Sequence, residues 1–215
     1  MTNNILYSAQ QKYLESLRKD QDPLIQKMER FAHENKIPIL GRESIEFLEQ
    51  IVSIHRPKAV LEIGMAIAYS TIRMASKLLD KGKIDSIEIS KQNILAARKF
   101  ISESKLSDKI NIIEDDALSI MPKLTQKYDL IFLDADKEDY EKLFYYSIIL
   151  LKKRGVIVVD NLLWHGYTAS RNVPTKYKSS TEHIRKFNKL FISQKGMDTT
   201  ILPIGDGIGL GVKLD

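Results

Sequence analysis

The sequence predicts an α/β protein built on a doubly wound, mostly parallel sheet of seven strands that ends in an antiparallel hairpin. Short apolar runs alternate five times with helical patterns after residue 57. The run at 128–133 is almost wholly apolar, which is typical of a parallel strand buried on both faces. The last two runs flank Gly205, Asp206 and Gly207, whose glycines favour a tight hairpin turn.

Three helices are predicted before the sheet, and we expect them to cover the edge of the sheet that binds ligands. The first has apolar residues spaced three and four apart on one face. These are Leu6, Ala9, Tyr13 and Leu17. Asp22 and Pro23 predict the N-cap and first position of the second helix, where the missing amide hydrogen of proline costs nothing. The third helix has its inward positions between Ile45 and His55.

The sheet elements then alternate along the chain. Strands are predicted at 58–63, 84–89, 110–113, 128–133, 156–159, 198–203 and 208–213. Helices are predicted at 69–79, around 94–101, at 140–151 and around 184–191, where apolar residues recur at spacings of three and four. Parallel strands joined by helices bring their carboxyl ends to one edge, and open α/β sheets bind ligands there.

The composition is that of one globular domain. The chain has 215 residues, of which 43% are hydrophobic and 28% charged. We expect a single domain over 1–215, with a helical cap at 1–56 and an α/β core at 57–215. Cysteine is absent, which excludes disulfides, thiolate zinc sites, iron–sulfur clusters and cysteine nucleophiles.

The ends and the charge of the chain bear on its location and partners. The N-terminus lacks a basic region followed by an apolar core, and no apolar run approaches the ~20 residues of a membrane span. We therefore expect a cytoplasmic protein with no membrane partner. The formal net charge of +5 suits a polyanionic partner, although a generally lysine-rich composition explains it equally well.

A nucleoside-type pocket is predicted where the first strand ends at Gly64. Glycine lets the backbone approach a ligand, and the next helix presents unpaired amide groups. A dinucleotide site would need G-x-G-x-x-G, but Ala66 and Ala68 follow Gly64 here. A cofactor without phosphates, carrying a carboxylate and an ammonium group, fits better.

Acidic residues at the next two strand ends strengthen the prediction of an adenosine-type ligand. Glu88 lies 24 residues after Gly64, where a carboxylate can bind a ribose diol. Asp115, Asp116 and Ala117 follow the third strand and are placed to meet an adenine amino group. Taken singly, a strand-end carboxylate is more often a solvated surface charge.

A metal site is predicted where two further strands end. Asp134 and the pair Asp160 and Asn161 each close an apolar run, while the first strand ends in Glu62-Ile-Gly64. Two carboxylates and an amide oxygen suit Mg²⁺ and are a poor set for zinc. The alternative is that these residues cap the following helices. Lys137 lies three residues after Asp134 and is a candidate general base, or a solvated charge.

Three motifs resemble those of the cation-dependent O-methyltransferases that use S-adenosylmethionine, such as catechol and caffeoyl-CoA O-methyltransferases. They are Leu61-Glu-Ile-Gly64 with Tyr69-Ser70, Phe132-Leu-Asp134-Ala-Asp136-Lys137 with Tyr140, and Val159-Asp160-Asn161 with Leu163-Trp164. The similarity runs from about residue 38 to the C-terminus. It implies a Rossmann-like class I methyltransferase fold.

The resemblance also implies roles for individual residues. Asp134, Asp160 and Asn161 resemble the ligands of Mg²⁺ or another divalent cation such as Mn²⁺ or Ca²⁺. Lys137, together with Asp134, resembles the catalytic residues. The positions that resemble the cofactor site are Ile39, Gly64, Tyr69, Ser70, Glu88, Asp115, Asp116, Ala117 and Asp134. The family usually has glycine where this chain has Ala68, and we expect its methyl group to narrow the methionine end of the pocket.

The predicted reaction is in-line transfer of the S-methyl group to a hydroxyl oxygen of an acceptor with two adjacent oxygens. Among bacterial members the chain is most similar to those that methylate 5-hydroxyuridine at the wobble position of the tRNA anticodon loop. Basic residues interleaved with tyrosines support an RNA partner. They are Tyr167, Arg171, Lys176, Tyr177, Lys178, Arg185, Lys186 and Lys189.

Two other functions stay open at this point. One is methylation of a small catechol or phenol, since its vicinal oxygens offer the same chelating pair as 5-hydroxyuracil. The other is non-catalytic binding of S-adenosylmethionine, which leaves the metal set and Lys137 unexplained. The first helices are expected to form a substrate lid or a homodimer surface, and an exposed apolar strip on them would favour dimerisation.

Overall fold

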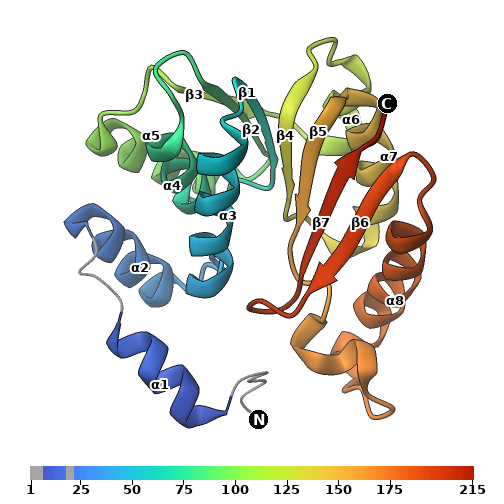
Figure 1. Cartoon of the computed structure of the whole chain (residues 1–215). Helices are drawn as coiled ribbons and strands as arrows, with labels where there is room; N and C mark the ends of the chain where they lie inside the picture. Colours follow the sequence, from blue (N-terminus) through green and yellow to red (C-terminus); the bar gives the residue numbers. More distant parts are fainter. Residues whose placement is uncertain (1–6, 18–21) are drawn as a thin grey trace.

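A computed structural model describes residues 7–17 and 22–215 and shows one seven-stranded sheet (Figure 1). Its order is β3-β2-β1-β4-β5-β7-β6. The strands are β1 Ala59–Ile63, β2 Lys83–Glu88, β3 Ile110–Glu114, β4 Tyr128–Leu133, β5 Leu151–Val159, β6 Met197–Leu202 and β7 Ile208–Lys213. The first five are parallel, and β7 lies antiparallel between β5 and β6. The predicted fold class is confirmed.

The helices flank this sheet. They are α1 Ser8–Ser16, α2 Pro23–Asn35, α3 Arg42–His55, α4 Tyr69–Lys77, α5 Lys91–Ser104, α6 Ala117–Ile120, α7 Tyr140–Leu150 and α8 Lys178–Ser193. Short 3₁₀ segments lie at η1 Met121–Lys123, η2 Lys137–Asp139, η3 Trp164–Ala169 and η4 Thr175–Tyr177, and η3 is kinked at His165 and Gly166. The 3₁₀ turns and α6 were not predicted, since such short elements leave no periodic pattern. Among the described residues, no helix combines the length and apolar character needed to cross a bilayer.

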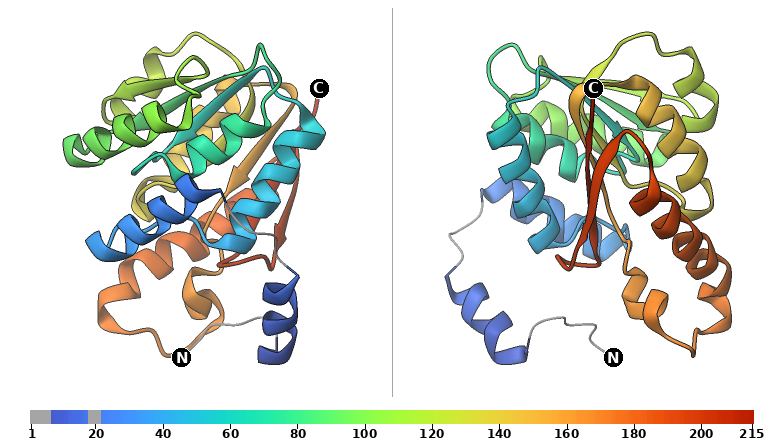
Figure 2. Two further views of the ribbon diagram at one scale, coloured as in Figure 1. Left: turned by 90° about the vertical axis from the view of Figure 1, so that its left-hand side faces the viewer. Right: turned by 45° about the vertical axis from the view of Figure 1, so that its right-hand side comes forward.

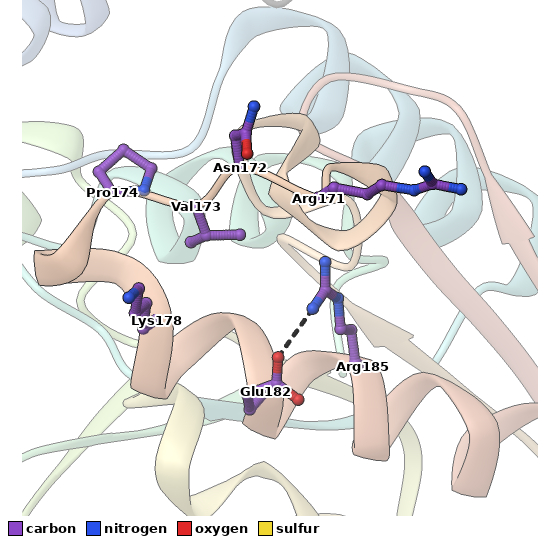
Figure 3. A pocket seen from close by; sticks show the side chains of 7 residues that line it. All are labelled: Arg171, Asn172, Val173, Pro174, Lys178, Glu182 and Arg185. Atoms are coloured by element: carbon purple, nitrogen blue, oxygen red, sulfur yellow. Dashed lines mark hydrogen bonds and ion pairs between the residues drawn. The ribbon is translucent and has the colours of Figure 1, made fainter.

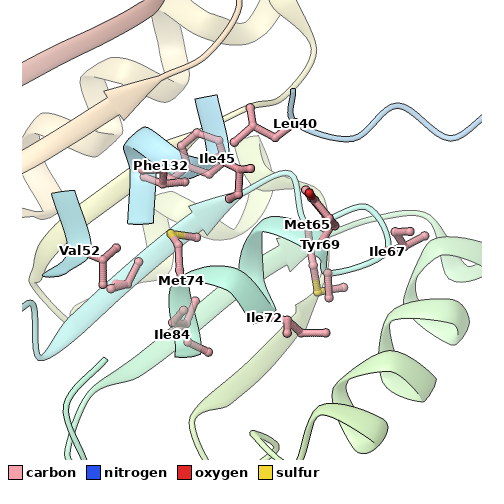
Figure 4. Close-up of a cluster of buried hydrophobic side chains, with 14 of the residues drawn as sticks. Leu40, Ile45, Val52, Met65, Ile67, Tyr69, Ile72, Met74, Ile84 and Phe132 are labelled. Carbon is pink, nitrogen blue, oxygen red and sulfur yellow. The ribbon is translucent and has the colours of Figure 1, made fainter. Parts of the chain in front are cut away.

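The two faces of the sheet carry separate apolar cores, because successive residues of a strand point to opposite sides. Val60 of β1 faces the layer of α2 to α5, and Leu61 faces the layer of α7 and α8 (Figure 2). Figure 4 shows the first core, where Ile45 of α3 and Met74 of α4 gather with Phe132 of β4. The sheet is thus buried on both sides, as the apolar run at 128–133 predicts.

Helices α2 and α3 pack their apolar faces into the first core. Ile45, Leu48 and Val52 of α3 are fully buried in the first core, so this helix covers a face of the sheet. Helix α2 packs along α5, where the Phe31 and Phe100 rings meet edge to face at 5.4 Å. The apolar faces of both helices thus complete the core, and the predicted edge cover is limited to the segment between them, where Pro38 and Ile39 reach the ligand edge.

Helix α1 forms where it was predicted, but its apolar face is exposed. Tyr13 is 63% exposed and Leu17 is 61% exposed. Ala9 is exposed as well, and Leu6 lies outside the described residues. In Figure 1 this helix stands below α2, away from the sheet. Such a face is a candidate contact surface for another chain.

The predicted boundaries hold within two residues for the other strands, but β5 is longer than expected. It begins at Leu151, which pairs with Tyr128 of β4, and α7 ends one residue earlier. This start was not predicted because the next residues, Lys152 to Arg154, are basic, and charged residues are rare in parallel strands. Arg154 has a φ of 60°, and the register between β4 and β5 shifts there.

Candidate active site

Three neighbouring strands end side by side at the carboxyl edge of the sheet. The register pairs Ile63 of β1 with Leu133 of β4, and Leu133 with Val159 of β5. The amide of Asp134 donates to the Ile63 carbonyl at 2.9 Å, and the amide of Asp160 donates to the Leu133 carbonyl at 3.1 Å. The structure therefore brings together groups that are far apart in the sequence, as the strand order requires.

Gly64 turns the chain away from β1 in a place where no side chain fits. Its φ is +95°, which residues with a Cβ rarely adopt. A Cβ added there would lie 1.9 Å from the carbonyl oxygen of Asp134. The missing Cβ therefore lets the turn after β1 pass close to the end of β4.

Gly64→Ala is expected to destabilise the protein by about 3 kcal/mol or more, because a backbone clash adds to the cost of positive φ. Urea unfolding followed by circular dichroism measures this loss. Gly196→Ala is the matched control, since Gly196 also has a positive φ but no atom within 4 Å of the added Cβ. The control should lose only about 1 kcal/mol. Equal losses in the two variants would contradict the role of the clash.

Most of the residues predicted for the site line one cavity of about 780 Å³ at this edge. They are Ile39, Gly64, Glu88, Asp115, Asp116, Ala117, Asp134, Lys137, Asp160 and Asn161. Its wall also includes Trp164 and His165, which were not in the predicted set. The volume is that of an ordinary small-molecule site.

Tyr69 and Ser70 point elsewhere. The Tyr69 hydroxyl donates to Glu29 of α2 at 2.7 Å, and the Ser70 hydroxyl donates to Glu62 at 2.5 Å. Neither residue is among those that line the cavity. Ala68 is fully buried in the core with a φ of 68°, so its methyl group does not narrow the cavity as expected. Glycine suits this position because of the left-handed backbone.

The acidic residues of the predicted adenosine end are held by the backbone around them. Glu88 accepts hydrogen bonds from the amides of Ala66 at 2.7 Å and Ser90 at 2.8 Å, so it joins the turn after β1 to the end of β2. Asp116 caps α6 by accepting from the Ser119 amide at 2.8 Å. Glu88 and Asp116 also line the cavity, so these backbone hydrogen bonds do not prevent either side chain from meeting a ligand.

Glu62 is an acidic residue whose importance only the structure shows. It is fully buried in β1, and three hydroxyl groups donate to its carboxylate. They belong to Ser70, Thr71 and Ser86 and lie 2.5 Å away. Burial raises the pKa of Glu62 to about 7 despite these hydrogen bonds. In the sequence, the sign of such a buried carboxyl group is a glutamate within an otherwise apolar strand.

The raised pKa of Glu62 predicts a pH-dependent stability. A carboxyl group whose pKa is higher in the folded protein stabilises the fold at low pH, and this contribution is lost as the pH rises from about 4.5 to 7. Between pH 5 and pH 8 the loss should be roughly 2–3 kcal/mol. Glu62→Gln should remove this part of the pH dependence in urea unfolding. An unchanged slope would contradict the prediction.

One of the candidate metal ligands, Asp160, has a buried carboxylate oxygen that accepts no hydrogen bond from the described residues. Asp160 is 4% exposed, and its Oδ1 has no hydrogen-bond partner. Burial and the nearby charge of Asp134 raise the pKa of Asp160 to about 8. The Asn161 amide nitrogen donates to Asp206 at 3.4 Å, which leaves the amide oxygen as the ligand atom. Within the described residues no group of three His, Asp or Glu side chains is placed to hold a metal ion.

Lys137 lies beside these carboxylates, on η2. Its ammonium group donates to Asp134 Oδ1 at 3.0 Å, to the Ala135 carbonyl at 3.0 Å and to the Tyr140 hydroxyl at 2.7 Å. The Tyr140 hydroxyl in turn donates to the Asp160 carbonyl at 3.1 Å. The Trp164 ring covers the ammonium group at 5.7 Å. The lysine is therefore held at the cavity wall, next to the candidate metal ligands.

A family model described as O-methyltransferase matches residues 12–214, which is nearly the whole chain. The chain belongs to the O-methyltransferase family. It is an S-adenosylmethionine-dependent O-methyltransferase, which agrees with the sheet-edge cavity described above.

Related proteins support this assignment. Caffeoyl-CoA O-methyltransferase 2 of Eucalyptus globulus is 33% identical over 174 residues, which cover 77% of this chain and 70% of that protein. A crystallised Staphylococcus aureus protein assigned as a caffeoyl-CoA O-methyltransferase is 30% identical, with a TM-score of 0.89 over 96% of this chain and 100% of the other. TomG from Streptomyces achromogenes, crystallised with S-adenosylmethionine, shares the fold at 22% identity, with a TM-score of 0.85 over 96% of each chain.

The O-methyltransferase has a second cavity of about 590 Å³, between the loop after β5 and the start of α8. Figure 3 shows Arg171 on the loop, and Lys178 and Arg185 on the helix. Arg185 was predicted to face RNA, but it donates to the carbonyls of Tyr167 and Thr168 at 3.0 and 3.1 Å and so anchors the loop. Lys186 is likewise paired with Glu141 at 2.8 Å.

The predicted aromatic residues of this loop form a cluster beside the active site. The Tyr167 and Tyr177 rings stack at 5.2 Å, and the Lys176 ammonium group lies 4.6 Å from the Tyr177 ring centre. Tyr177 also meets the Trp164 ring at 6.2 Å. Because Trp164 lines the active-site cavity, the cluster connects that cavity to the basic loop.

Proposed function

We propose that this O-methyltransferase holds a divalent cation on Asp134, Asp160 and Asn161 and methylates one of two adjacent oxygens of a small phenolic acceptor. The observation that carries the proposal is the buried Oδ1 of Asp160, which has no hydrogen-bond donor and lies near a second carboxylate. Such a set suits Mg²⁺, Mn²⁺ or Ca²⁺. The relatives named as caffeoyl-CoA O-methyltransferases support the phenolic acceptor.

The residues of the cavity divide the work of the reaction. S-Adenosylmethionine supplies the electrophilic methyl group, and a bound divalent cation lowers the pKa of an acceptor hydroxyl. Glu88 and the segment Asp115 to Ala117 bind the adenosine part, and Gly64 lines the same cavity. Lys137, in its neutral amine form, takes up the acceptor proton at Nζ and becomes the ammonium group that Asp134 and Tyr140 can bind. Trp164 and His165 line the acceptor side and orient the acceptor against the methyl donor.

A second candidate acceptor is 5-hydroxyuridine in a tRNA anticodon loop. The exposed Arg171, Lys176 and Lys178 beside the stacked Tyr167 and Tyr177 favour it, since phosphates and an unstacked base need such groups. A coenzyme A thioester also carries phosphates, so the same basic surface serves either acceptor. Both acceptors offer two adjacent oxygens and phosphates. The enzyme therefore selects between them by the size of the molecule that can reach the cavity.

Methyl transfer from labelled S-adenosylmethionine separates these acceptors. Catechol, caffeoyl-CoA and tRNA containing 5-hydroxyuridine are each incubated with Mg²⁺ or with EDTA, and products are identified by mass spectrometry. We expect methylated caffeoyl-CoA or catechol, and loss of product with EDTA. Methylation of tRNA alone would replace the phenolic acceptor by the second candidate. Full turnover in EDTA, with no increase on adding any cation, would refute the metal site.

The same assay tests whether the basic surface formed by Arg171, Lys176 and Lys178 binds the phosphates of the acceptor. The double variant Arg171→Ala/Lys178→Ala should raise the KM for caffeoyl-CoA or tRNA about tenfold or more, because two phosphate contacts are lost. The KM for catechol, which has no phosphate, should stay unchanged. An equal change for catechol would show that the variant perturbs the cavity instead.

The proposal includes a homodimer in which a second copy covers α1. The exposed Tyr7, Tyr13, Leu14 and Leu17 support it, since they are 81%, 63%, 44% and 61% exposed. Light scattering after size exclusion should give twice the chain mass. Replacing Tyr13 and Leu17 by Ser should shift this mass to that of one chain.

A further inference from the structure

The tip of the hairpin between β6 and β7 reaches the candidate metal site. We infer that Asp206, at this tip, is a positioning residue that fixes the orientation of Asn161 and the start of the loop after β5. The inference rests on the proposed cation site for its first part. Its second part concerns only the conformation of the loop.

Asp206 contacts the segment after β5 through both of its carboxylate oxygens. Oδ1 accepts from the His165 amide at 2.6 Å, and Oδ2 accepts from the Asn161 side-chain nitrogen at 3.4 Å. The backbone adds two contacts, since the carbonyls of Asp206 and Gly207 accept from the amides of Leu163 at 2.8 Å and Leu162 at 2.9 Å. The His165 ring adds a further contact, with Nδ1 3.5 Å from Asp206 Oδ2. The tip thus contacts the segment at five places.

The segment needs such external contacts because its backbone is strained. Asn161, Trp164 and His165 have φ values of 62°, 46° and 54°. Residues with a Cβ adopt such values rarely and hold them only where neighbouring structure imposes them. The contacts of Asp206 fall on Asn161 and His165, the first and last of these three.

The chemistry of the Asp206 carboxylate selects one orientation of the Asn161 amide. An ionised carboxylate accepts hydrogen bonds and cannot donate them. The amide of Asn161 therefore turns its nitrogen to Asp206, and its oxygen becomes the atom available to a cation. Metal ligands are commonly held in this way by a neighbouring group, whose loss weakens metal binding 10- to 100-fold.

The tip is held from both sides, so Asp206 cannot easily move. A Cβ on Gly205 would lie 2.2 Å from the Ser44 hydroxyl of α3, and a Cβ on Gly207 would lie 2.5 Å from Leu163 Cγ. The tip is therefore packed between α3 and the segment it positions. Any movement of the hairpin would be passed on to Asn161.

Two variants separate the two contacts of the side chain. Asp206→Asn keeps an acceptor for the His165 amide but presents a donor to Asn161, which then turns its oxygen away from the cation. Asp206→Ala removes both hydrogen bonds and the contact of Oδ2 with the His165 ring. Asp198→Asn, at an exposed position of β6 in the same hairpin, is the matched control.

Mn²⁺ affinity, measured by electron paramagnetic resonance without acceptor, tests the first contact. We expect Asp206→Asn to weaken Mn²⁺ binding 10- to 100-fold and the control to leave it unchanged. The same substitution in an Asn161→Asp background should not weaken binding, because the introduced amide then donates to a carboxylate. Equal weakening in both backgrounds would indicate a simple charge effect and overturn the inference, as would wild-type affinity in Asp206→Asn.

Tryptophan fluorescence tests the second contact without any cation. Trp164 is the single tryptophan of the chain and lies next to His165. Acrylamide quenching should increase at least twofold in Asp206→Ala and stay near the wild-type value in Asp206→Asn. Unchanged quenching in Asp206→Ala would refute the role in loop positioning. Absence of Mn²⁺ binding by the wild-type protein would refute the cation site and the first part of the inference, while the quenching result still decides the second.

Discussion

Replacing Lys137 by methionine is expected to lower kcat by 10²- to 10⁴-fold and to leave the affinity for S-adenosylmethionine nearly unchanged. This range is the usual contribution of a positioned general base. Lys137 contacts Asp134 and Tyr140 at the wall of the active-site cavity. Methionine has a similar length but cannot take up a proton. Steady-state rates and isothermal titration with the cofactor measure the two effects separately.

Two further variants show what Lys137 contributes. Lys137→Arg keeps a positive charge beside Asp134, but arginine stays protonated and cannot act as a base. We therefore expect it to be nearly as inactive as the methionine variant. Recovered activity in Lys137→Arg would mean that the charge, rather than proton uptake, is needed. Lys142→Met, an exposed position of α7, should keep the wild-type rate.

Asp160→Asn is expected to lower kcat strongly and, in the presence of EDTA, to make the protein more stable. A ligand of a catalytic cation is worth several kcal/mol in the transition state, so kcat should fall on the order of 10³-fold. The stability should rise by roughly 1–3 kcal/mol, since a buried carboxylate oxygen without a donor is replaced by a neutral amide.

The role of Asp160 can also be tested through the pH dependence of protein stability and its response to Mg²⁺. The pKa of Asp160 is raised to about 8, so its ionisation destabilises the fold as the pH rises from about 4 to 8. Urea unfolding in EDTA should show less loss of stability over this range in Asp160→Asn than in the wild type. Mg²⁺ should raise the Tm of the wild type and leave that of the variant unchanged. A variant that is less stable in EDTA at pH 8 would contradict this account.

The fold and the strand-end residues could be predicted because their signals are local. Alternation of apolar runs with helical patterns indicates a parallel sheet, and such a sheet brings its carboxyl ends to one edge. Asp134 and Asp160 could therefore be placed together although 26 residues separate them in the chain. The register of β4 with β5 agrees with that placement.

Contacts between distant elements could not be predicted, because apolar spacing does not say which surfaces meet. Helix α3 has a regular apolar face, but only packing shows that this face meets the sheet and α4. The Tyr69 hydroxyl meets Glu29 because α2 lies beside α4. The early start of β5 could not be predicted for a similar reason, because it depends on the pairing of Leu151 with Tyr128 of the neighbouring strand.

The class of fold, the chemical character of the strand ends and the family motifs follow from the sequence alone, since each depends on residues close together in the chain. Which residues surround those strand ends depends on how the whole chain packs. This packing placed three hydroxyl groups around Glu62 and left an oxygen of Asp160 without a donor. It also brought Asp206 to Asn161 across 45 residues. Burial and hydrogen bonding are set by the whole packed chain, and that is why these properties appear only in the folded protein.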